Sequence, residues 1–411
     1  MANSWTGGQF SLYRVLFGIY LFVHFTYLIP WAPELFSSAG MLPVAKESPL
    51  LWLFPNILAV IDDPWFVIGL AMASSIASLF FCVGYGDRAA ALFMWFVLAC
   101  FFGRNPLTAN PSLPYVGLML LAHLFIPKGP YGSFSARGRV DPDGGWKLPA
   151  GIFLALWVVL ALSYSYSGYT KLLSPSWVAG QNVVYVLENP LARDWWLRDV
   201  FLAMPSILLK LLTWFILVIE LLFALFALSA WCRPFVWAGM LVVQFGFAFL
   251  LNFPDLTLAM LLFHLITSNP AWIAPRTVAT GATLYFDGGC ALCHGTVRFL
   301  IAEDRHGRLA FSPIKGKAIN EKLPADLIAN LPDSIVLAVD GNILLKSDAI
   351  ISCLEMLGGL WRPIGIAMRL IPKPIRNWGY DVIASRRYAW FGTKDESCPL
   401  MPADLRDRFS A

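Results

Sequence analysis

The sequence predicts a multi-pass α-helical membrane bundle of about eight helices, followed by a small C-terminal α/β domain. The chain of 411 residues is 58% hydrophobic and contains 17 Trp and 31 Phe. Its charged side chains are distributed unevenly, because residues 281–411 hold 30 of the 56 and the first 280 residues hold only 26. Residues 285–293 read Tyr-Phe-Asp-Gly-Gly-Cys-Ala-Leu-Cys, which places two cysteines where an apolar strand gives way to a helix.

This distribution of charge predicts a membrane domain over residues 1–275, a linker over 276–281 and a C-terminal domain over 282–411. Hydrophobic stretches near the ~20 residues that span a bilayer cover residues 10–29, 64–84, 89–103, 112–127, 148–170, 206–229, 233–252 and 254–268. Several of these stretches are short enough to be tilted, re-entrant or fused in one unit.

The N-terminus and the loops predict an orientation. Residues 1–10 lack a basic region, so we expect the first apolar stretch to remain as an anchor instead of being cleaved. With eight helices and an inner N-terminus, the inner loops carry seven Lys and Arg residues and the outer loops five. We therefore expect an integral membrane protein with a cytoplasmic C-terminal domain.

No cluster of basic residues is larger than those usual in a loop, which argues against a nucleic-acid partner.

Polar side chains inside the apolar stretches need an explanation, because an ionised group at the bilayer centre costs about 2.5–3.5 kcal/mol on insertion scales. Glu220 lies in the middle of one stretch, so it should face the bundle interior and be protonated or paired. Lys210 is about three turns away on the same helix, so a histidine on another helix is the expected partner. With Lys171, His123 and His264, Glu220 would form a polar cavity for a quinone or a lipid headgroup. Alternatively, each histidine hydrogen-bonds a neighbouring helix.

The C-terminal domain has an alternating pattern of strands and helices. The expected strands cover residues 282–286, 309–313, 335–339 and 343–346, and the expected helices cover 291–303, 318–330, 348–357, 363–371 and 374–386. This order indicates a thioredoxin-like plan, in which a cis-proline usually precedes a strand that faces the cysteines. Pro332 is the only proline near such a strand, and it stands three residues early.

Cys290 and Cys293 have the spacing of a redox pair at the start of a helix. Gly288 and Gly289 permit a sharp turn after the strand, and Cys290 would cap the helix. Backbone N–H groups at a helix N-terminus stabilise a thiolate, which predicts that Cys290 attacks and Cys293 resolves. Asp287, three residues before Cys290, would accept a proton during exchange or cap the turn.

The same pair would also fit half of a zinc site or an inert packing contact. A structural zinc needs four ligands. The other residues that could supply zinc ligands are not spaced in any recognisable metal-binding pattern. They are His294, His306, Cys353 and Cys398. The ligand count therefore favours a redox pair without a metal.

A longer series of motifs resembles the DCC family of thiol-disulfide oxidoreductases. The matching residues are Asp287-Gly288-Gly289-Cys290-Ala291-Leu292-Cys293, Arg298-Phe299-Leu300, Asp304-Arg305, Phe311, Ser347-Asp348-Ala349, Ile371-Pro372-Lys373-Pro374-Ile375-Arg376, Arg387-Tyr388, Phe391-Gly392 and Cys398-Pro399. The resemblance covers residues 282–402 and implies a small thioredoxin-like domain with Cys290 and Cys293 as its redox pair. It implies a chemistry and no substrate, so the partner would be an unidentified thiol protein or small thiol.

The membrane half resembles the HTTM domain, which many bacterial membrane proteins share with vitamin K-dependent γ-carboxylase. The matching residues lie within 9–275 and are Leu12-Tyr13-Arg14-Val15-Leu16-Phe17-Gly18, Arg104-Asn105-Pro106, Lys171-Leu172, Trp177, Gly180, His264-Leu265 and Asn269-Pro270-Ala271-Trp272. A bacterial-type inner membrane and its lipids are the expected surroundings. In the carboxylase a lysine near a Lys-Leu-Asp-x-x-Trp stretch serves as base, and Lys171 lies close to that place. Here Ser174 replaces the acidic residue and Trp177 stands one residue later.

Two classes of function follow from these observations. In the first, the protein is a membrane-tethered thiol-disulfide oxidoreductase, and Cys290 and Cys293 exchange electrons with a protein or a membrane-soluble cofactor. In the second, the protein is a lipid-modifying or transport module that works around Glu220 and Lys171. The C-terminal domain would then be regulatory.

The predicted orientation can be tested with reporters fused to the C-terminus. A reporter that works only in the cytoplasm should be active, because the loop charges and the even helix count place residues 281–411 there. Activity of an export-dependent reporter at the same position would mean an odd number of spans and an outward-facing domain.

Overall fold

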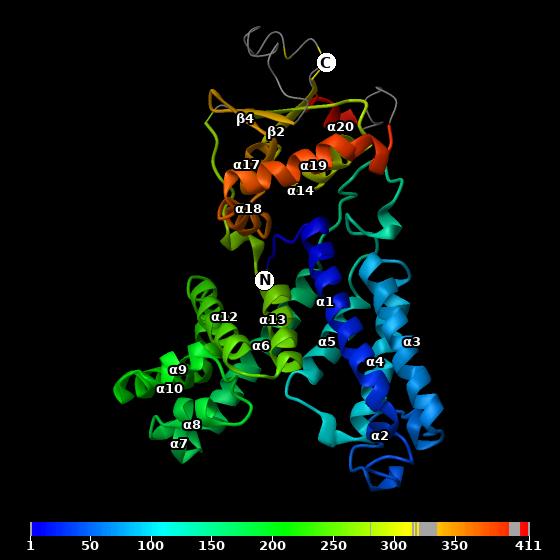
Figure 1. The fold of residues 1–411 in the computed structure, drawn as a ribbon, viewed down its shortest axis with the longest axis vertical. Helices are drawn as coiled ribbons and strands as arrows, with labels where there is room; N and C mark the ends of the chain where they lie inside the picture. Colours follow the sequence, from blue (N-terminus) through cyan, green and yellow to red (C-terminus); the bar gives the residue numbers. More distant parts are fainter. Residues whose placement is uncertain are drawn as a thin grey trace. The chain divides into compact units, whose positions relative to one another are not determined.

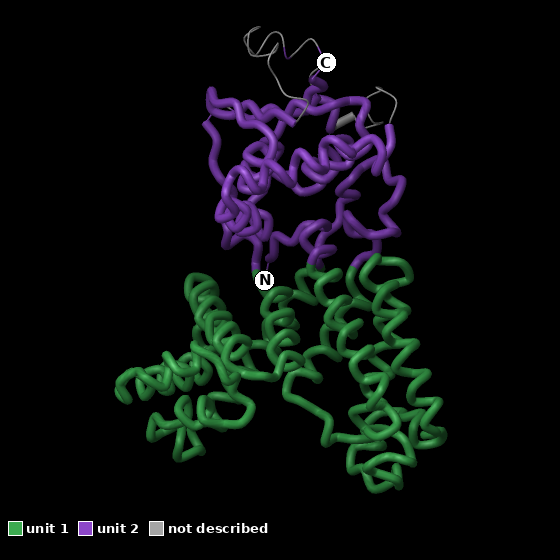
Figure 2. Tube along the Cα trace, viewed as in Figure 1, with its two compact units in different colours: residues 1, 13–126, 149–268 green, residues 2–12, 127–148, 269–411 purple. Residues whose placement is uncertain are grey.

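The computed structural model of the protein describes residues 2–279, 281–314, 316, 319, 335–393 and 403–409. The chain forms two compact units. Unit 1 contains residues 13–126 and 149–268, and unit 2 contains residues 2–12, 127–148 and 269–411 (Figure 2). The N-terminal segment and the 127–148 loop therefore belong to the same compact unit as the C-terminal domain.

Unit 1 is helical (Figure 1). Its helices, the first of which begins in unit 2, are Gly7–Leu28 (α1), Ala32–Phe36 (α2), Pro64–Val83 (α3), Asp87–Arg104 (α4), Leu113–His123 (α5), Ala150–Leu172 (α6), Pro175–Val178 (α7), Asn182–Glu188 (α8), Trp196–Leu202 (α9), Ser206–Leu221 (α10), Phe223–Leu228 (α11), Arg233–Leu250 (α12) and Pro254–Thr267 (α13). Local sequence sets their ends. Asp63 caps α3 by accepting the N–H of Trp65 at 2.8 Å, and Gly84 ends α3 in the left-handed conformation.

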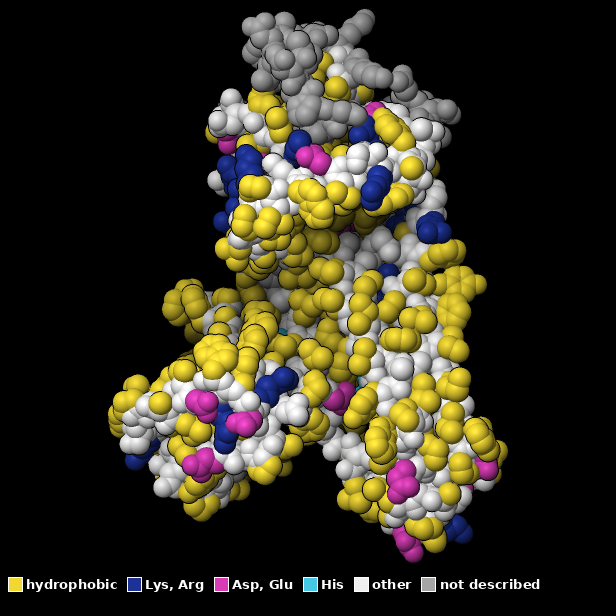
Figure 3. Space-filling view, viewed as in Figure 1, with side chains coloured by type: hydrophobic (Ala, Val, Ile, Leu, Met, Phe, Trp, Pro, Cys, Tyr) yellow, Lys and Arg dark blue, Asp and Glu magenta, His cyan; other side chains and the backbone are white. Residues whose placement is uncertain are grey.

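Each of the eight expected apolar stretches contains a helix, but eight membrane spans are not confirmed. Among the described residues, four helical segments are long and apolar enough to cross a membrane, namely Gly7–Phe36, Pro64–Val83, Ala150–Leu172 and Arg233–Leu250. A fifth results if α9 and α10, bent by 103°, form one broken span. Helices α5 and α13 are apolar but shorter than the ~20 residues of a span. Apolar side chains cover much of the face of unit 1 seen in Figure 3.

Small residues let helices of unit 1 approach one another closely, as is common in membrane bundles. A Cβ atom on Gly18 of α1 would collide with Cys82 of α3. A Cβ atom on Gly168 of α6 would collide with the backbone of Leu221 at the end of α10. The second close approach lies next to Glu220, so it determines which side chains of α6 can reach that carboxylate.

The described residues of unit 2 form a four-stranded mixed sheet in the order β2-β1-β3-β4. The strands are Ala282–Phe286 (β1), Leu309–Pro313 (β2), Val336–Val339 (β3) and Asn342–Leu345 (β4). Strand β1 is parallel to β2 and antiparallel to β3, and Leu284 lies opposite Phe311 on one side and Leu337 on the other. Strands β3 and β4 form an antiparallel hairpin.

The described helices of unit 2 pack around this sheet (Figure 1). They are Ala291–Glu303 (α14), Lys346–Leu357 (α17), Trp361–Arg369 (α18), Lys373–Phe391 (α19) and Ala403–Arg406 (α20). The predicted bounds of β1, β2 and α14 are confirmed, and those of β3, β4, α17 and α18 are correct within two residues. Helix α19 continues to Phe391, beyond its predicted end at 386. The expected helix over 318–330 and Pro332 lie outside the described residues.

One face of the sheet holds the main core of unit 2. Leu284 and Phe286 of β1 lie in the same buried cluster as Val297 and Leu300 of α14. Tyr285 belongs to a separate cluster on the other face, as expected from the two-residue period of a strand. Burial of a large apolar side chain contributes roughly 1.5–3 kcal/mol. This face of the sheet therefore fixes the position of α14.

Glu303, the last residue of α14, joins segments of unit 2 that are distant in sequence. Its buried carboxylate accepts the N–H of Gly8 at 2.8 Å, the indole N–H of Trp361 at 2.6 Å and the hydroxyl of Thr6. Burial raises the pKa of Glu303, and these hydrogen bonds offset part of the rise. Gly8 lies in the first turn of α1, where negative charge is favourable. The N-terminal segment is thereby held at the far end of the helix that begins after Cys290.

Candidate functional site

Strand β1 leads into a turn that ends at Cys290, and α14 begins at the next residue. Cys290 has an extended backbone, with φ −100° and ψ 120°, and is the N-cap of α14. Its Sγ accepts the backbone N–H of Cys293 at 3.4 Å. The prediction that Cys290 caps the helix is confirmed. A thiolate at this position would receive an N–H donor and the positive end of the helix dipole.

Cys293 lies one turn inside α14, in a different environment. Burial raises the pKa of Cys293, and the adjacent Cys290 raises it further. A thiol of this kind remains protonated at neutral pH and is a poor nucleophile until a base or a change in its surroundings activates it. The two sulfurs are therefore unequal, and the geometry favours Cys290 for the first attack.

Asp287 stabilises the turn and connects it to α19. Its Oδ1 accepts the N–H of Gly289 at 3.0 Å, and its Oδ2 accepts the Arg387 guanidinium at 3.0 Å and the hydroxyl of Tyr388. Burial raises the pKa of Asp287, but the hydrogen bonds from Tyr388 and Arg387 outweigh it and leave the pKa below its ordinary value. An ionised carboxylate with these partners is a weak proton acceptor. Of the two expected roles, the geometry favours capping.

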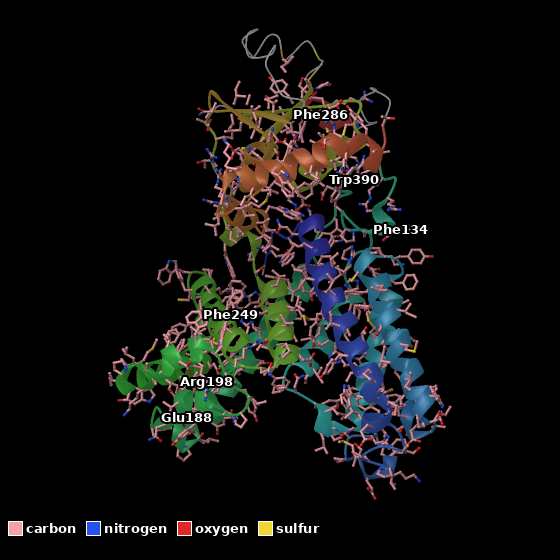
Figure 4. All side chains as sticks on the ribbon, viewed as in Figure 1. Phe134, Glu188, Arg198, Phe249, Phe286 and Trp390 are labelled. Atoms are coloured by element: carbon pink, nitrogen blue, oxygen red, sulfur yellow. The ribbon has the colours of Figure 1, made fainter. Side chains whose placement is uncertain are left out.

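His294 directly follows the cysteine pair and bonds back to the turn. Its Nε2 lies 2.6 Å from the carbonyl oxygen of Gly288, which can only accept, so Nε2 carries the hydrogen. The ring packs edge-on against Phe286, with centroids 5.9 Å apart, and Phe286 is labelled at the end of β1 in Figure 4. From the sequence, His294 was a candidate only for zinc ligation. Its position four residues after Cys290, on the same face of α14, was the available signal for a structural role.

The other candidate zinc ligands of the described residues do not form a metal site with the pair, although Cys353 belongs to the same buried cluster as Cys290 and Cys293. Cys353 is buried in the core, on α17, and His306 is exposed in the turn that follows α14. Cys398 lies outside the described residues. Within the parts of the chain that the structure describes, no group of three or more His, Cys, Asp or Glu side chains could hold a metal ion.

A cavity of about 130 Å³ opens beside Cys293. It is lined mostly by apolar side chains, and Asp287, Thr296, Tyr380 and Arg387 are polar members of its lining. The residues around it are Asp287, Leu292, Cys293, Thr296, Ile335, Ile350, Tyr380, Ile383, Ala384 and Arg387. Cys290 does not line this cavity and is 0% exposed. Access to the two sulfurs thus differs, because Cys293 borders an opening and Cys290 is covered.

The two residues that follow α19, Gly392 and Thr393, pair with the backbone at the start of α14. The carbonyl of Gly392 accepts the N–H of Ala291 at 3.3 Å, and Thr393 forms an isolated antiparallel bridge with Cys290. Gly392 has φ 81° and ψ −179°, a region that is almost restricted to glycine. We term Gly392–Thr393 the strap. The strap thus pairs with the backbone of Cys290 and Ala291, beside a thiol that is 0% exposed.

In unit 1 the structure pairs Glu220 of α10 with Lys171 of α6. The buried carboxylate accepts a hydrogen bond from Nζ of Lys171, which also lies 4.6 Å from the ring centroid of Trp177. The expectation of a histidine partner was wrong. The reason is the absence of a side chain at Gly168, which lets α6 approach α10 closely enough for the lysine to reach the carboxylate.

The two candidate histidines of unit 1 belong to different polar contacts. Nε2 of His264 lies 3.2 Å from the hydroxyl of Tyr164, and that hydroxyl accepts the amide N–H of Gln244 at 2.9 Å. His123 instead pairs with Asp87, with Nε2 and Oδ2 3.1 Å apart.

A separate apolar cavity of about 610 Å³ is lined by Leu211, Trp214, Phe215, Val218, Ile219, Phe226, Trp231, Cys232, Phe235 and Val236. Lys171 and Glu220 are brought together, but the four candidate residues do not line this cavity.

Replacing Gly392 with alanine should make Cys290 more reactive. An L-residue at this φ and ψ costs about 1–3 kcal/mol, and a Cβ atom there would meet nothing within 4 Å, so the strain falls on the strap alone. Alkylation of Cys290 by a small reagent, followed by mass spectrometry, should be several-fold faster. Gly379→Ala in the helical part of α19, where a Cβ atom also meets nothing within 4 Å, is the matched control and should be unchanged. An unchanged rate in Gly392→Ala would show that the strap does not limit access.

Comparison with known proteins identifies the C-terminal domain. The DCC1-like thiol-disulfide oxidoreductase family matches residues 284–393. The uncharacterized protein YuxK of Bacillus subtilis is 38% identical over 131 residues, which are 31% of this chain and 91% of that protein. A chloroplastic DCC family protein of Arabidopsis thaliana is 29% identical over 120 residues, 28% of this chain and 68% of that protein. No solved structure matches the chain. Through this domain, the chain belongs to the DCC1-like thiol-disulfide oxidoreductase family.

Proposed function

We propose that the protein is a membrane-tethered thiol-disulfide oxidoreductase whose reactive groups are Cys290 and Cys293. The observation that carries the proposal is the N–H of Cys293 directed at the Cys290 sulfur, at the start of α14. Family membership supports a redox role for the domain. The strand order β2-β1-β3-β4, with the pair directly after β1, supports a thioredoxin-like plan.

The reaction follows from the inequality of the two sulfurs. In the reducing direction, the Cys290 thiolate attacks one sulfur of a substrate disulfide, forms a mixed disulfide, and releases the other substrate sulfur as a thiolate. Cys293 then loses its proton and attacks the Cys290 sulfur, which forms the internal disulfide and releases the second substrate thiol. Two electrons pass from the pair to the substrate. The reverse sequence oxidises a substrate dithiol.

Several observations support tethering to a bacterial-type inner membrane with the pair in the cytoplasm. In the part of the chain that the structure describes, four or five helical segments have the length and composition of spans. The N-terminal segment, the 127–148 loop and the C-terminal domain form one compact unit, which is consistent with an even number of spans between them. In the cytoplasm, glutathione-type reductants would keep the pair mostly reduced. The redox partner is then an unidentified thiol protein or small thiol.

The membrane half, with its HTTM-like motifs, would place polar groups near a quinone or lipid. Tyr164 and Lys171 are seven residues apart on α6, about two helical turns, and therefore lie on the same face. Tyr164 contacts His264, and Lys171 contacts Glu220.

The buried ion pair also favours a second candidate function, a lipid-modifying or transport module regulated by the C-terminal domain. A buried ion pair is weak support for stability alone, which is why it favours a functional role.

Cys293→Ser should trap a mixed disulfide through Cys290. The variant retains the capped nucleophile and lacks the thiol that would resolve the intermediate. Incubation of the purified variant with a disulfide substrate, followed by mass spectrometry without reductant, should show one substrate-derived thiol on Cys290. In the wild type, resolution should accelerate as pH rises past neutral, because burial raises the pKa of Cys293. A stable adduct on neither sulfur, or equal alkylation of both thiols near pH 7, would contradict the proposed order.

Glu220→Gln should preserve folding while abolishing quinone or lipid binding or turnover, because it keeps the shape of the side chain and removes its charge. The substitution leaves Lys171 without its carboxylate, so Lys171→Gln/Glu220→Gln is the matched variant that removes both charges. Bound quinone or lipid in reconstituted protein can be measured by mass spectrometry. Full binding and turnover in both variants would show that the pair only connects α6 to α10.

A further inference from the structure

Unit 2 exposes a cluster of large apolar side chains where α18 ends and α19 begins. Leu370 is 83% exposed, Trp378 is 69% exposed and Ile375 is 57% exposed, and Ile366 and Ile371 are also exposed. We term these five residues the α18–α19 face. Single exposed apolar residues are ordinary, but a cluster within thirteen residues marks an interaction surface.

The opposite side of α18 is already used by the core of unit 2. Trp361, Ile364 and Met368 pack against the buried cluster that contains Cys290 and Cys293. Gly365 is also buried and lies against α17. Helix α18 therefore has one apolar side that stabilises the domain, while Ile366 on its outer side is left to solvent. The exposed apolar side chains of the α18–α19 face are therefore not part of the core that stabilises unit 2.

Positive charge surrounds this face. The cationic side chains around it are Arg276, Arg362, Arg369, Lys373 and Arg376, against the two carboxylates of Asp348 and Glu355. Each carboxylate is shared by two of the cations, so the region keeps a net positive charge. Dark-blue and yellow side chains adjoin in this part of unit 2 in Figure 3. Basic residues next to exposed Trp, Leu and Ile side chains are typical of segments that lie in the surface of an anionic membrane.

The face is held close to the chain that leaves the last apolar helix. The carbonyl of Ile273 accepts the N–H of Gly359 at 2.9 Å, and the carbonyl of Ala274 accepts the Arg362 guanidinium. Ala274 is seven residues after the end of α13 at Thr267, so the connection spans at most about 25 Å. The start of α18 is therefore hydrogen-bonded to the segment that follows α13 in the sequence.

We propose that the α18–α19 face docks on the anionic phospholipid surface of the bilayer that holds the apolar helices. Trp378, Leu370 and Ile375 enter the headgroup region, and the surrounding Arg and Lys side chains contact lipid phosphates. The proposal rests on the membrane placement proposed above. It goes beyond tethering, because it assigns a second, peripheral membrane contact to the redox domain. That contact limits the orientations of the domain and hence the directions from which a partner can approach the cysteine pair.

Hydrogen–deuterium exchange of the full chain in nanodiscs tests this docking. Nanodiscs of phosphatidylcholine alone would be compared with nanodiscs that contain about 30% phosphatidylglycerol, the anionic probe. Amides of residues 366–378 should exchange about threefold or more slowly in the anionic discs, because docking suppresses local opening of the helix ends. The difference should disappear at high salt, which screens the attraction between cations and lipid phosphates.

Leu370→Glu/Trp378→Glu should abolish the protection, since it places negative charge in the docked face. Trp390→Glu is the matched control, because Trp390 is 55% exposed on the same helix and lies twelve residues further along it (Figure 4). This control should retain the protection, and exchange in β1 and α14 should be equal in all variants if they remain folded. Equal exchange of residues 366–378 in both lipids would overturn the proposal, as would protection that appears only with a second protein. Recovery of the chain in nanodiscs tests the membrane placement separately.

Discussion

The hydrogen bond from the Cys293 N–H to the Cys290 sulfur is the interaction on which the proposed chemistry depends. It exists because β1 ends in a turn that brings Cys290 to the N-cap position of α14, and because the sheet core holds that helix in place. Cys290 thus lies at a helix N-terminus, and Cys293 lies in the first turn, where burial raises its pKa. The proposed order of attack and resolution rests on this difference in surroundings.

Support for the turn comes from distant parts of the sequence. Asp287 is held by Arg387 and Tyr388 from α19, and the strap at the end of the same helix covers Cys290. Helix α19 and the two residues after it therefore contact both ends of the turn that carries Cys290. Cys290 is 0% exposed and Cys293 borders a cavity, so the reaction proposed at Cys290 requires movement of the strap before thiol exchange begins.

The sequence predicted the local structure of the site and missed its long-range partners. The strand, the turn, the cap and α14 were predicted with correct bounds, because an apolar run, two glycines and a helical period are all local signals. Arg387 and Tyr388 were noticed only as family motifs, since no local pattern shows that residues about one hundred positions later contact Asp287. The placement of residues 2–12 and 127–148 in the unit of the redox domain was missed for the same reason. For Glu220, the partner was wrongly expected to be a histidine, although Gly168, one turn before Lys171, was a signal of close helix packing.

The most direct test of the proposed chemistry is a redox titration of the full chain. The protein would be equilibrated in glutathione buffers of stepwise potential and alkylated, and the fragment containing Cys290 and Cys293 would be analysed by mass spectrometry. A redox pair predicts that both thiols become protected from alkylation together, in one two-electron transition with a slope of about 30 mV per tenfold change in the ratio of oxidised to reduced pair. Thiols that remain alkylated at every potential, or that oxidise independently of each other, would contradict the account.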